Sequence, residues 1–504
     1  MKHTHKRLLS LLLAAVMLLP LAACSNGENN ADTQADGSLP AVESGSEAET
    51  DRFAGVNFKD RTYAVYTSIY DYGNGMGNSN FLIEGTDETA SNHVNAAVLE
   101  RNQITEQLLG IKLSYTQADL SYDAVAADVR KLVSSGTHEY DLIVNDLFPL
   151  AILSLEGSFR NALDEEAVFD FEQPYWYRDF MTDTTLLGNY QYILAGDYTA
   201  DVLRSVHCLL FNKTMYNEYF HTDANEPYEW VKNYEWTYDR MTETVSGIYA
   251  DKNNSGKRDD GDTYGFIGCT YWAECIAFVT SAAPGFVERD EDGEVYIVLG
   301  QNDRAEELSE KILALFWNDG ASVNVTDYTL LPDAFVEGQC LFVGNQRLGS
   351  LENPLFRNRN IEVGILPYPM LRASDKKYTT AAHDTTEIAV IPSTEPDLGF
   401  ASTVVEVLCR ETARRVLPQY YKESLQIKYV DDSYAADMID IIHDNISESF
   451  VLCYNNALGS LMMNSFSEAA QNKRTFSAVF ASRARSLDNQ LKGKLKSFRK
   501  KVGD

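Results

Sequence analysis

The stretch Asp251–Asp262 carries oxygen-bearing side chains at the spacing of a calcium-binding loop. In such a loop, side-chain oxygens at positions 1, 3, 5, 9 and 12 and the backbone carbonyl at position 7 surround the ion, and glycine at position 6 allows the turn. Gly256 stands at position 6. The ligand positions are Asp251, Asn253, Ser255, Lys257 through its carbonyl, Asp259 and Asp262. Asp262 replaces the usual glutamate and reaches less far, so the sequence predicts a weak structural calcium site. The alternative is a polar loop between a helix and a strand.

A second group of residues suits a small ligand, because aromatic side chains offer stacking platforms and Asp or Asn side chains offer hydrogen bonds. Tyr70 and Tyr72 follow the first predicted strand, and Asn145 and Asp146 follow the predicted strand 142–144. Ligands of open α/β sheets bind beyond the carboxyl ends of the strands. We therefore expect these four side chains to contact a ligand. For any single tyrosine the alternative is packing, because the chain contains 29 of them.

The sequence favours binding over catalysis. The 74 acidic residues would supply a glycosidase pair by number alone, so their presence does not discriminate. No G-x-S-x-G, HExxH or P-loop motif occurs, and His207 and His383 have no matching nucleophile. We predict that the chain is not an enzyme. The alternatives are an exported carbohydrate-active enzyme and a surface carbohydrate sensor or adhesion lipoprotein.

The N-terminus indicates export. Lys2, Lys6 and Arg7 precede a short apolar run that ends in Leu21-Ala22-Ala23-Cys24. This ending resembles the bacterial lipobox, which implies a signal peptide over 1–23 and a lipid on Cys24. Two or more acyl chains anchor a protein stably. Residues 24–55 are rich in Ser, Gly, Asn, Asp and Glu, and they predict a disordered tether. The expected location is the extracellular face of the cytoplasmic membrane, with an incidental Cys24 in a secreted protein as the alternative.

The net charge and the cysteine content exclude some functions and bear on disulfide bonding. A formal net charge of −31 argues against binding of nucleic acid, which needs concentrated Lys and Arg. Six cysteines follow Cys24, and an even number in an exported protein permits disulfides. Most of the six have apolar neighbours, which favours buried free thiols over a structural bridge.

Apolar periodicity predicts alternating strands and helices. Strands are expected at 62–66, 111–115 and 142–144, with helices over 94–108 and 122–133 between them, the second capped by Ser121. The continuous apolar run at 142–144 is typical of a strand buried on both faces of a parallel sheet. Further strands are expected at 206–211, 264–267, 295–299, 361–366 and 388–391. Further helices are expected over 238–248 and 308–316, the chain beyond 400 is mostly helical, and 492–501 predicts a solvated terminal helix. Such alternation indicates an α/β fold.

Four segments resemble motifs of the family 1 extracellular solute-binding proteins of bacterial ABC importers. They are 209–216 (LLFNKTMY), 235–239 (EWTYD), 335–339 (FVEGQ) and 361–367 (IEVGILP). Each motif is weak alone, and their shared order and spacing over residues 58–430 carry the resemblance. Phe211 and Cys340 depart from the usual residues at their positions without removing a group that the fold needs.

The resemblance implies a two-lobed, type II periplasmic-binding-protein-like fold whose lobes are joined by hinge crossings. It divides the chain into lobe 1, residues 56–194 with 383–414, and lobe 2, residues 205–381 with 415–504. The crossings would lie near 195–204 and 379–383. A ligand that contacts both lobes would favour the closed arrangement.

The resemblance also implies further ligand contacts. Asp197 and Tyr198 lie at the first expected crossing and Asp384 at the second, Tyr271 and Trp272 follow a second-lobe strand, and Asn345 follows the FxxG segment and its strand. Ordinary turn or packing roles are the alternatives for each. The implied function is capture of a sugar or oligosaccharide, without a required cofactor, by a monomer that delivers it to an ABC permease.

Overall fold

The computed structural model describes residues 51–68, 83–85, 93–270, 272–298, 303–323, 328–357, 361–422 and 433–503. The predicted signal peptide and lipid-bearing Cys24 lie outside these residues, as do Tyr70, Tyr72 and Tyr271. The described part is a mixed α/β fold with two main sheets, as the sequence predicts.

The first sheet has the strand order β13-β3-β1-β2. Its strands are β1 (Arg61–Ser68), β2 (Ile111–Ala118), β3 (Leu142–Asp146) and β13 (Glu387–Val390). β1 runs parallel to β2 and β3, whereas the late strand β13 pairs antiparallel with β3. All five residues of β3 are buried, which confirms the prediction of a strand covered on both faces.

Helices α2 (His93–Leu109) and α3 (Tyr122–Ser134) connect these strands, within about a residue of the predicted spans. Gly110 ends α2 with a φ of 60°, a conformation that favours glycine. Ser121 stands at the N-cap of α3 as predicted, but its side chain makes no capping hydrogen bond.

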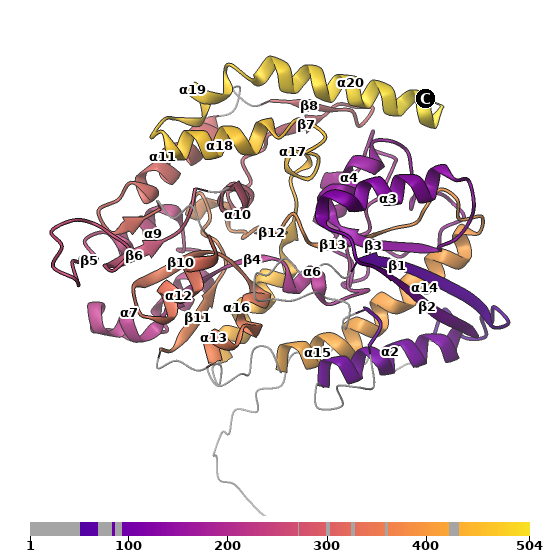
Figure 1. The fold of residues 1–504 in the computed structure, drawn as a ribbon, viewed down its shortest axis with the longest axis horizontal. Coiled ribbons are helices and arrows are strands. Elements are labelled where there is room, and N and C mark those ends of the chain that lie inside the picture. The colour runs from indigo at the N-terminus through magenta and orange to yellow at the C-terminus, as the bar shows by residue number, and fades with distance from the viewer. Residues whose placement is uncertain are drawn as a thin grey trace, which may run out of the picture. The chain divides into compact units, whose positions relative to one another are not determined.

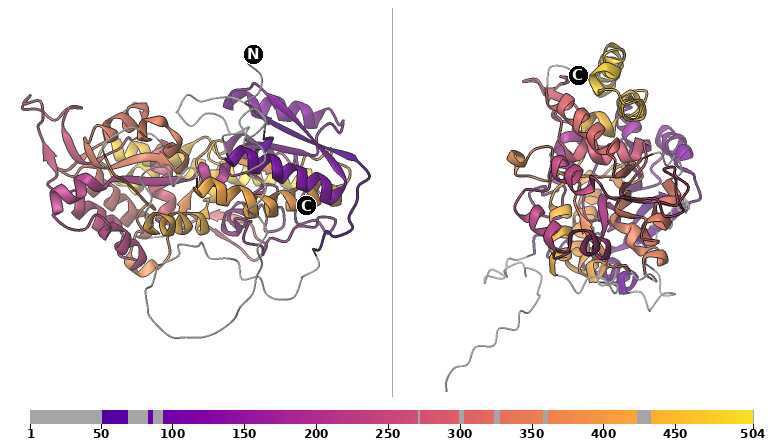
Figure 2. Two further views of the ribbon diagram at one scale, coloured as in Figure 1. Left: turned by 90° about the horizontal axis from the view of Figure 1, so that it is seen from below. Right: turned by 90° about the vertical axis from the view of Figure 1, so that its left-hand side faces the viewer.

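The second sheet has the order β11-β4-β10-β6-β5, with β9 beside β6. Its strands are β4 (His207–Asn212), β5 (Tyr249–Ala250), β6 (Thr263–Ile267), β9 (Ala321–Ser322), β10 (Cys340–Arg347) and β11 (Val363–Leu366). β10 pairs with both β4 and β6, so a strand that the periodicity did not predict lies in the middle of this sheet. Figure 1 shows β1, β2, β3 and the orange β13 together, apart from the group of β4, β6, β10 and β11. Figure 2 gives two further views of the same ribbon.

Helices surround both sheets. The earlier ones are α4 (Leu147–Ser154), α5 (Arg178–Thr184), α6 (Asp201–Arg204), α7 (Lys213–Phe220), α8 (Glu226–Lys232), α9 (Tyr238–Val245), α10 (Trp272–Ser281), α11 (Asp303–Phe316), α12 (Leu331–Val336) and α13 (Pro354–Arg357). The later ones are α14 (Leu398–Glu411), α15 (Leu417–Tyr420), α16 (Ser433–Asp444), α17 (Phe450–Cys453), α18 (Leu461–Gln471), α19 (Phe476–Phe480) and α20 (Ala484–Val502). Thr237 caps α9 by accepting from the backbone N–H of Arg240.

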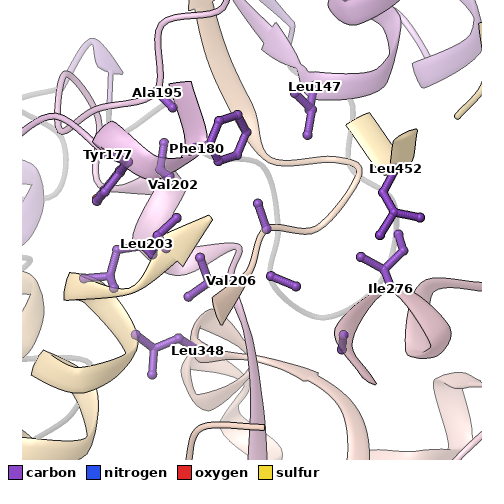
Figure 3. Packing of buried hydrophobic residues seen from close by; sticks show 14 of the residues in the cluster. Leu147, Tyr177, Phe180, Ala195, Val202, Leu203, Val206, Ile276, Leu348 and Leu452 are labelled. Atoms are coloured by element: carbon purple, nitrogen blue, oxygen red, sulfur yellow. The ribbon is translucent and has the colours of Figure 1, made fainter. Parts of the chain in front are cut away.

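Isolated β-bridges hold the two segments in which the chain passes from one sheet to the other. Val206 forms a β-bridge with Ala382, and Leu194 forms one with Ala389. A small parallel sheet of β12 (Thr380–Ala381) and β14 (Ile446–Ser447) adds a C-terminal strand beside the second passage. We call these segments, 194–206 and 379–386, the crossings. Buried apolar side chains surround them, among them Val202, Leu203 and Val206 (Figure 3).

The C-terminal segment from β14 to α20 contacts elements of both sheets. α17 packs against α4 and α5, while α18 packs against α10 and α11. Figure 3 shows Leu452 of α17, Leu147 of α4 and Ile276 of α10 among the buried side chains. Phe498 of α20 meets the rings of Tyr190 and Tyr192 at 5.2 and 5.9 Å, and α20 also contacts the hairpin strand β8 (Val295–Ile297), which pairs with β7 (Val287–Arg289). The predicted terminal helix therefore forms, but it packs one face against the protein.

Two further sequence expectations can be compared with the described residues. Cys208, Cys269, Cys275, Cys340, Cys409 and Cys453 are all free and buried, which confirms the preference for thiols over bridges. None of the helices in the described ranges combines the length and apolar character needed to cross a membrane.

Candidate ligand-binding site at the crossings

The carboxyl end of β3 brings three predicted ligand residues together. Asn145 and Asp146 end the strand opposite Ile388 and Glu387 of β13. Directly after them, the backbone N–H of Phe148 donates to the carbonyl of Asp384 at 3.4 Å. Asn145, Asp146 and Asp384 thus lie at one edge of the first sheet, beside the second crossing.

Several buried polar atoms at this edge have no hydrogen-bond partner in the described part of the chain. They are Thr67 Oγ1 at the end of β1, Asn145 Nδ2 and Thr386 Oγ1. Thr67 and Thr386 are fully buried, and Asn145 is 2% exposed. Buried polar groups are almost always satisfied, by protein, water or ligand. This edge therefore offers hydroxyl and amide groups that the described residues leave without a partner.

The second sheet presents its own polar edge to the crossings. His207 begins β4 opposite Arg347 of β10, and the ring of His207 lies 5.2 Å from that of His383 in the second crossing. Arg347 Nη1 donates to Thr385 Oγ1 at 3.1 Å, and His383 Nδ1 lies 2.7 Å from Asp384 Oδ1. Side chains of both sheets therefore meet at the second crossing.

Burial dominates the electrostatics of this meeting point. It lowers the pKa of His207 well below its ordinary value, with His383 and Arg347 adding to the effect. Burial also lowers the pKa of His383, and it lowers the pKa of Arg347 to about 10, helped by the charge of Arg204. Both imidazoles are therefore neutral near pH 7, and Arg347 keeps its positive charge.

Asn345, another predicted contact, lies in a bulge of β10 with a φ of 52°. Its backbone N–H donates to the hydroxyl of Tyr368 at 3.2 Å, and that hydroxyl donates to Glu274 Oε1 at 3.0 Å. A Cβ on Gly344 would clash with the Glu274 carboxylate, so a larger residue there would displace this buried acid. Burial raises the pKa of Glu274 to about 8. A buried acid on α10 thus fixes the backbone that presents Asn345.

Asp197 and Tyr198 occupy the first crossing but turn into the protein. Tyr177 donates its hydroxyl proton to Asp197 Oδ1 at 2.5 Å, and His443 Nε2 lies 3.8 Å from the same oxygen. The hydroxyl of Tyr198 donates to the carbonyls of Leu194 and Glu387. Both side chains anchor the crossing, and a ligand contact by either one stays a prediction. Trp272 begins α10, and its side chain lies outside the described part.

Sequence reasoning missed Glu448, which is 1% exposed and follows β14. Burial, together with the charges of Asp183 and Asp384, raises the pKa of Glu448 to about 8. The neighbouring Ser447 Oγ donates to Asp183 Oδ2 at 3.3 Å. No signal in the sequence linked Glu448 to Asp384, because residues 64 positions apart meet only through the pairing of β12 with β14. His207 and His383 did flank the expected crossings, and that position could have identified them.

Hydrogen bonds among its own polar groups hold the predicted calcium loop together. Asp251 accepts from the backbone N–H groups of Ser255 and Gly256, and Ser255 Oγ donates to Asp259 Oδ2 at 2.8 Å. Asn253 Nδ2 donates to Asp259 Oδ1 at 2.8 Å, and Ser255 Oγ lies 3.0 Å from the carbonyl of Lys257. The buried Asp262 accepts from the Tyr249 hydroxyl and from the backbone N–H of Lys252. These hydrogen bonds connect the predicted ligand residues, but Asp251, Asp259 and Asp262 do not bring three ligand atoms within 4.8 Å of one another, so calcium binding stays a prediction.

Solved structures of other proteins share this arrangement of sheets and helices. A solute-binding protein of an ABC transporter from Thermotoga lettingae, bound with α-D-tagatose, matches with a TM-score of 0.52 and 12% identity, covering 86% of this chain and all of that one. A cyclo/maltodextrin-binding protein complexed with maltotetraose matches with a TM-score of 0.53 and 12% identity, covering 88% of this chain and 98% of that one. This chain has the two-lobed fold of a solute-binding protein. The fold agrees with the resemblance carried by the four sequence motifs. No family model and no curated protein matches the sequence.

Proposed function

We propose that this chain is a family 1 solute-binding protein that captures a sugar or oligosaccharide between its lobes for an ABC importer. The observation that carries the proposal is the meeting of polar side chains from both sheets at the crossings. Asn145, Thr386 and Asp384 come from the first lobe, and His207 and Arg347 come from the second. Hydroxyl, carboxamide, carboxylate and guanidinium groups are the partners that sugar hydroxyls require. The bound tagatose and maltotetraose of the two neighbours support a saccharide.

The cellular setting belongs to the same proposal. The lipobox-like Leu21–Cys24 supports a lipid anchor on Cys24, and the tether after it would hold the folded body beside a permease on the extracellular face of the membrane. The protein would act as a monomer and release its solute unchanged. Labelling of the wild-type chain, but not of Cys24→Ser, with a radioactive fatty acid in the native host tests the anchor.

Asn145→Ala is expected to weaken sugar binding about tenfold, which corresponds to the roughly 1–1.5 kcal/mol of a hydrogen bond. Its Nδ2 has no hydrogen-bond partner in the described part of the chain, so the truncation should leave the fold intact. Calorimetry follows a thermal-shift screen of the mature protein against mono- and oligosaccharides, D-tagatose and maltotetraose included. Asn472→Ala on the exposed end of α18 is the control.

Two results would contradict this proposal. One is that no saccharide raises the melting temperature, since a ligand of the folded state stabilises it by mass action. The other is recovery of cleaved sugar from the incubation, which would support the carbohydrate-active enzyme instead. Asn145→Ala binding as tightly as the wild type would remove this residue from the site.

We further propose that Asp251–Asp262 binds one calcium ion as a structural element. Calcium at a hundredfold excess over its dissociation constant is expected to stabilise the protein by about 2.7 kcal/mol, and Asp259→Asn should abolish that gain. Asp260→Asn removes the same charge from an exposed position of the same loop that is not a ligand position, so it should keep the gain. Thermal unfolding with calcium and with chelator measures all three proteins. An unchanged melting temperature of the wild type would exclude a structural ion.

A further inference from the structure

Outside the crossings and the calcium loop, one group of side chains converges without a role in the proposed function. His138 lies between α3 and β3, Asp141 directly precedes β3, and Glu395 follows β13. One ligand atom from each lies within 4.8 Å of the other two. His138 Nε2 is 3.2 Å from Asp141 Oδ1 and 2.6 Å from Glu395 Oε2. Among the described residues this is the one such group of three or more metal-ligating side chains.

The two carboxylates are buried, and each directs one oxygen to the shared centre. Asp141 is 2% exposed and Glu395 is 1% exposed. Apart from the close approach of His138 Nε2, Asp141 Oδ1 and Glu395 Oε2 have no hydrogen-bond partner in the part of the chain that the structure covers. The second oxygen of each is held by backbone: Asp141 Oδ2 accepts from Ala64 N at 2.6 Å, and Glu395 Oε1 accepts from Asp397 N at 2.8 Å. Hydrogen bonds to the outer atoms of ligating groups are how proteins orient metal ligands.

The local charges favour a cation at this centre. Arg61 faces both carboxylates, with Nη2 at 3.5 Å from Glu395 Oε1 and at 4.0 Å from Asp141 Oδ1. Its Nη1 is already paired with Asp397 Oδ2 at 2.7 Å. Arg160 Nη1 donates to the backbone carbonyl of Glu395 at 2.7 Å, and its Nη2 pairs with Glu166. A divalent ion between Asp141 and Glu395 would therefore relieve the repulsion of their facing oxygens, which Arg61 approaches only from one side. Two buried carboxylate oxygens that face each other repel unless a proton or a cation lies between them.

We propose that His138, Asp141 and Glu395 bind one divalent transition-metal ion of the zinc class. One imidazole nitrogen with two carboxylate oxygens is a donor set typical of zinc, whereas calcium and magnesium prefer oxygen alone. His138 is partly exposed, with a side chain 35% accessible, so water can reach the open side as a fourth ligand. The site lies where β1 and β3 begin, at the opposite end of these strands from Asn145. Its role is to fasten Glu395, in the returning chain, to the first lobe.

Zinc titration of the intact, tag-free mature protein after chelator treatment tests this site. We expect one tightly bound equivalent of Zn²⁺ by equilibrium dialysis and elemental analysis, together with a higher melting temperature. His138→Ala should lower the zinc affinity by at least roughly tenfold, since even outer partners of ligands contribute about 10–100-fold. His138 is exposed enough that this variant should fold, and its circular dichroism checks that. Co²⁺ in place of Zn²⁺ should give visible absorption that His138→Ala loses.

Two matched controls make the outcome decisive. His221→Asn removes another exposed histidine at a position with a φ of 54°, where Asn is tolerated, and it should keep the zinc equivalent. Asp259→Asn alters the calcium loop and should also keep it. The inference is overturned if the wild type takes up no stoichiometric zinc, or if His138→Ala binds zinc as the wild type does. Loss of zinc in His221→Asn would assign the ion to surface histidines instead.

Discussion

Arg204→Met is expected to lower the free energy of unfolding by about 3–5 kcal/mol, the usual cost of removing one partner of a buried ion pair. Arg204 ends α6 in the first crossing and is 2% exposed. Its Nε donates to both oxygens of Glu352 at 2.9 and 3.0 Å, and its Nη1 lies 3.4 Å from Asp201 Oδ1. Methionine keeps much of the volume but leaves two carboxylates without their cation. Urea unfolding at pH 7 measures the loss.

Arg372→Met provides the comparison. Arg372 pairs with Glu307, but its side chain is 47% exposed, and exposed pairs contribute about 0–1 kcal/mol. A loss in Arg204→Met no larger than in Arg372→Met would show that the crossing does not depend on this charge. The double variant Arg204→Met with Glu352→Gln should recover part of the stability, because it removes one of the carboxylates that the single variant leaves unpaired.

Glu448→Gln is expected to flatten the pH dependence of stability between about pH 4.5 and 8. Burial raises the pKa of Glu448 to about 8, so in this window the folded state holds a proton that the unfolded state releases. The contribution to stability is therefore fully present below about pH 4.5, falls as the pH rises, and reaches its low plateau above about pH 8. One such proton corresponds to about 1.4 kcal/mol per pH unit. Glutamine carries no proton to lose, so the variant should lack this part of the slope.

Urea unfolding at half-unit steps from pH 4.5 to 8.5 measures the difference between the two proteins. Glu337→Gln, at an exposed position after α12, is the control and should follow the wild type. Identical slopes for Glu448→Gln and the wild type would mean that Glu448 is already ionised in the folded state at pH 7. Water would then have to reach the Glu448 carboxylate beside the paired strands β12 and β14.

The sequence predicted most elements that have a local signature. β3 is a short apolar run, and α2, α3, α9 and α11 carry apolar residues at helical spacing, so each forms within a few residues of the expected span. Periodicity did not predict β10, whose partners β4 and β6 lie far away in the sequence, and only the FxxG resemblance implied a strand before Asn345. The hairpin of β7 and β8 was half predicted, from the residues of β8 alone.

Within the candidate site, too, only the residues with a local sequence signal could be predicted. Asn145 and Asp146 could be predicted because the end of a buried strand is visible in the sequence, and the structure brings Asp384 beside them. Asp197 and Tyr198 show the limit of that reasoning. Their position in the crossing was expected, but whether a side chain faces a ligand or Tyr177 depends on packing. Glu274, Glu448 and the group of His138 depend on contacts between distant segments, which no local pattern reports.

The contacts of α20 have a consequence for how the chain is completed during synthesis. Phe498 covers Tyr190 and Tyr192, and Lys501 Nζ donates to the carbonyl of Glu156, 345 residues earlier. Domains generally fold as they emerge, N-terminus first, and exposed apolar surface before completion invites aggregation. The apolar faces of Tyr190 and Tyr192 stay exposed until α20 has been synthesised and packs against them. A product that stops short of residue 484 would therefore retain an exposed apolar patch at Tyr190 and Tyr192. Chaperones and quality-control proteases could recognise the truncated chain by this patch.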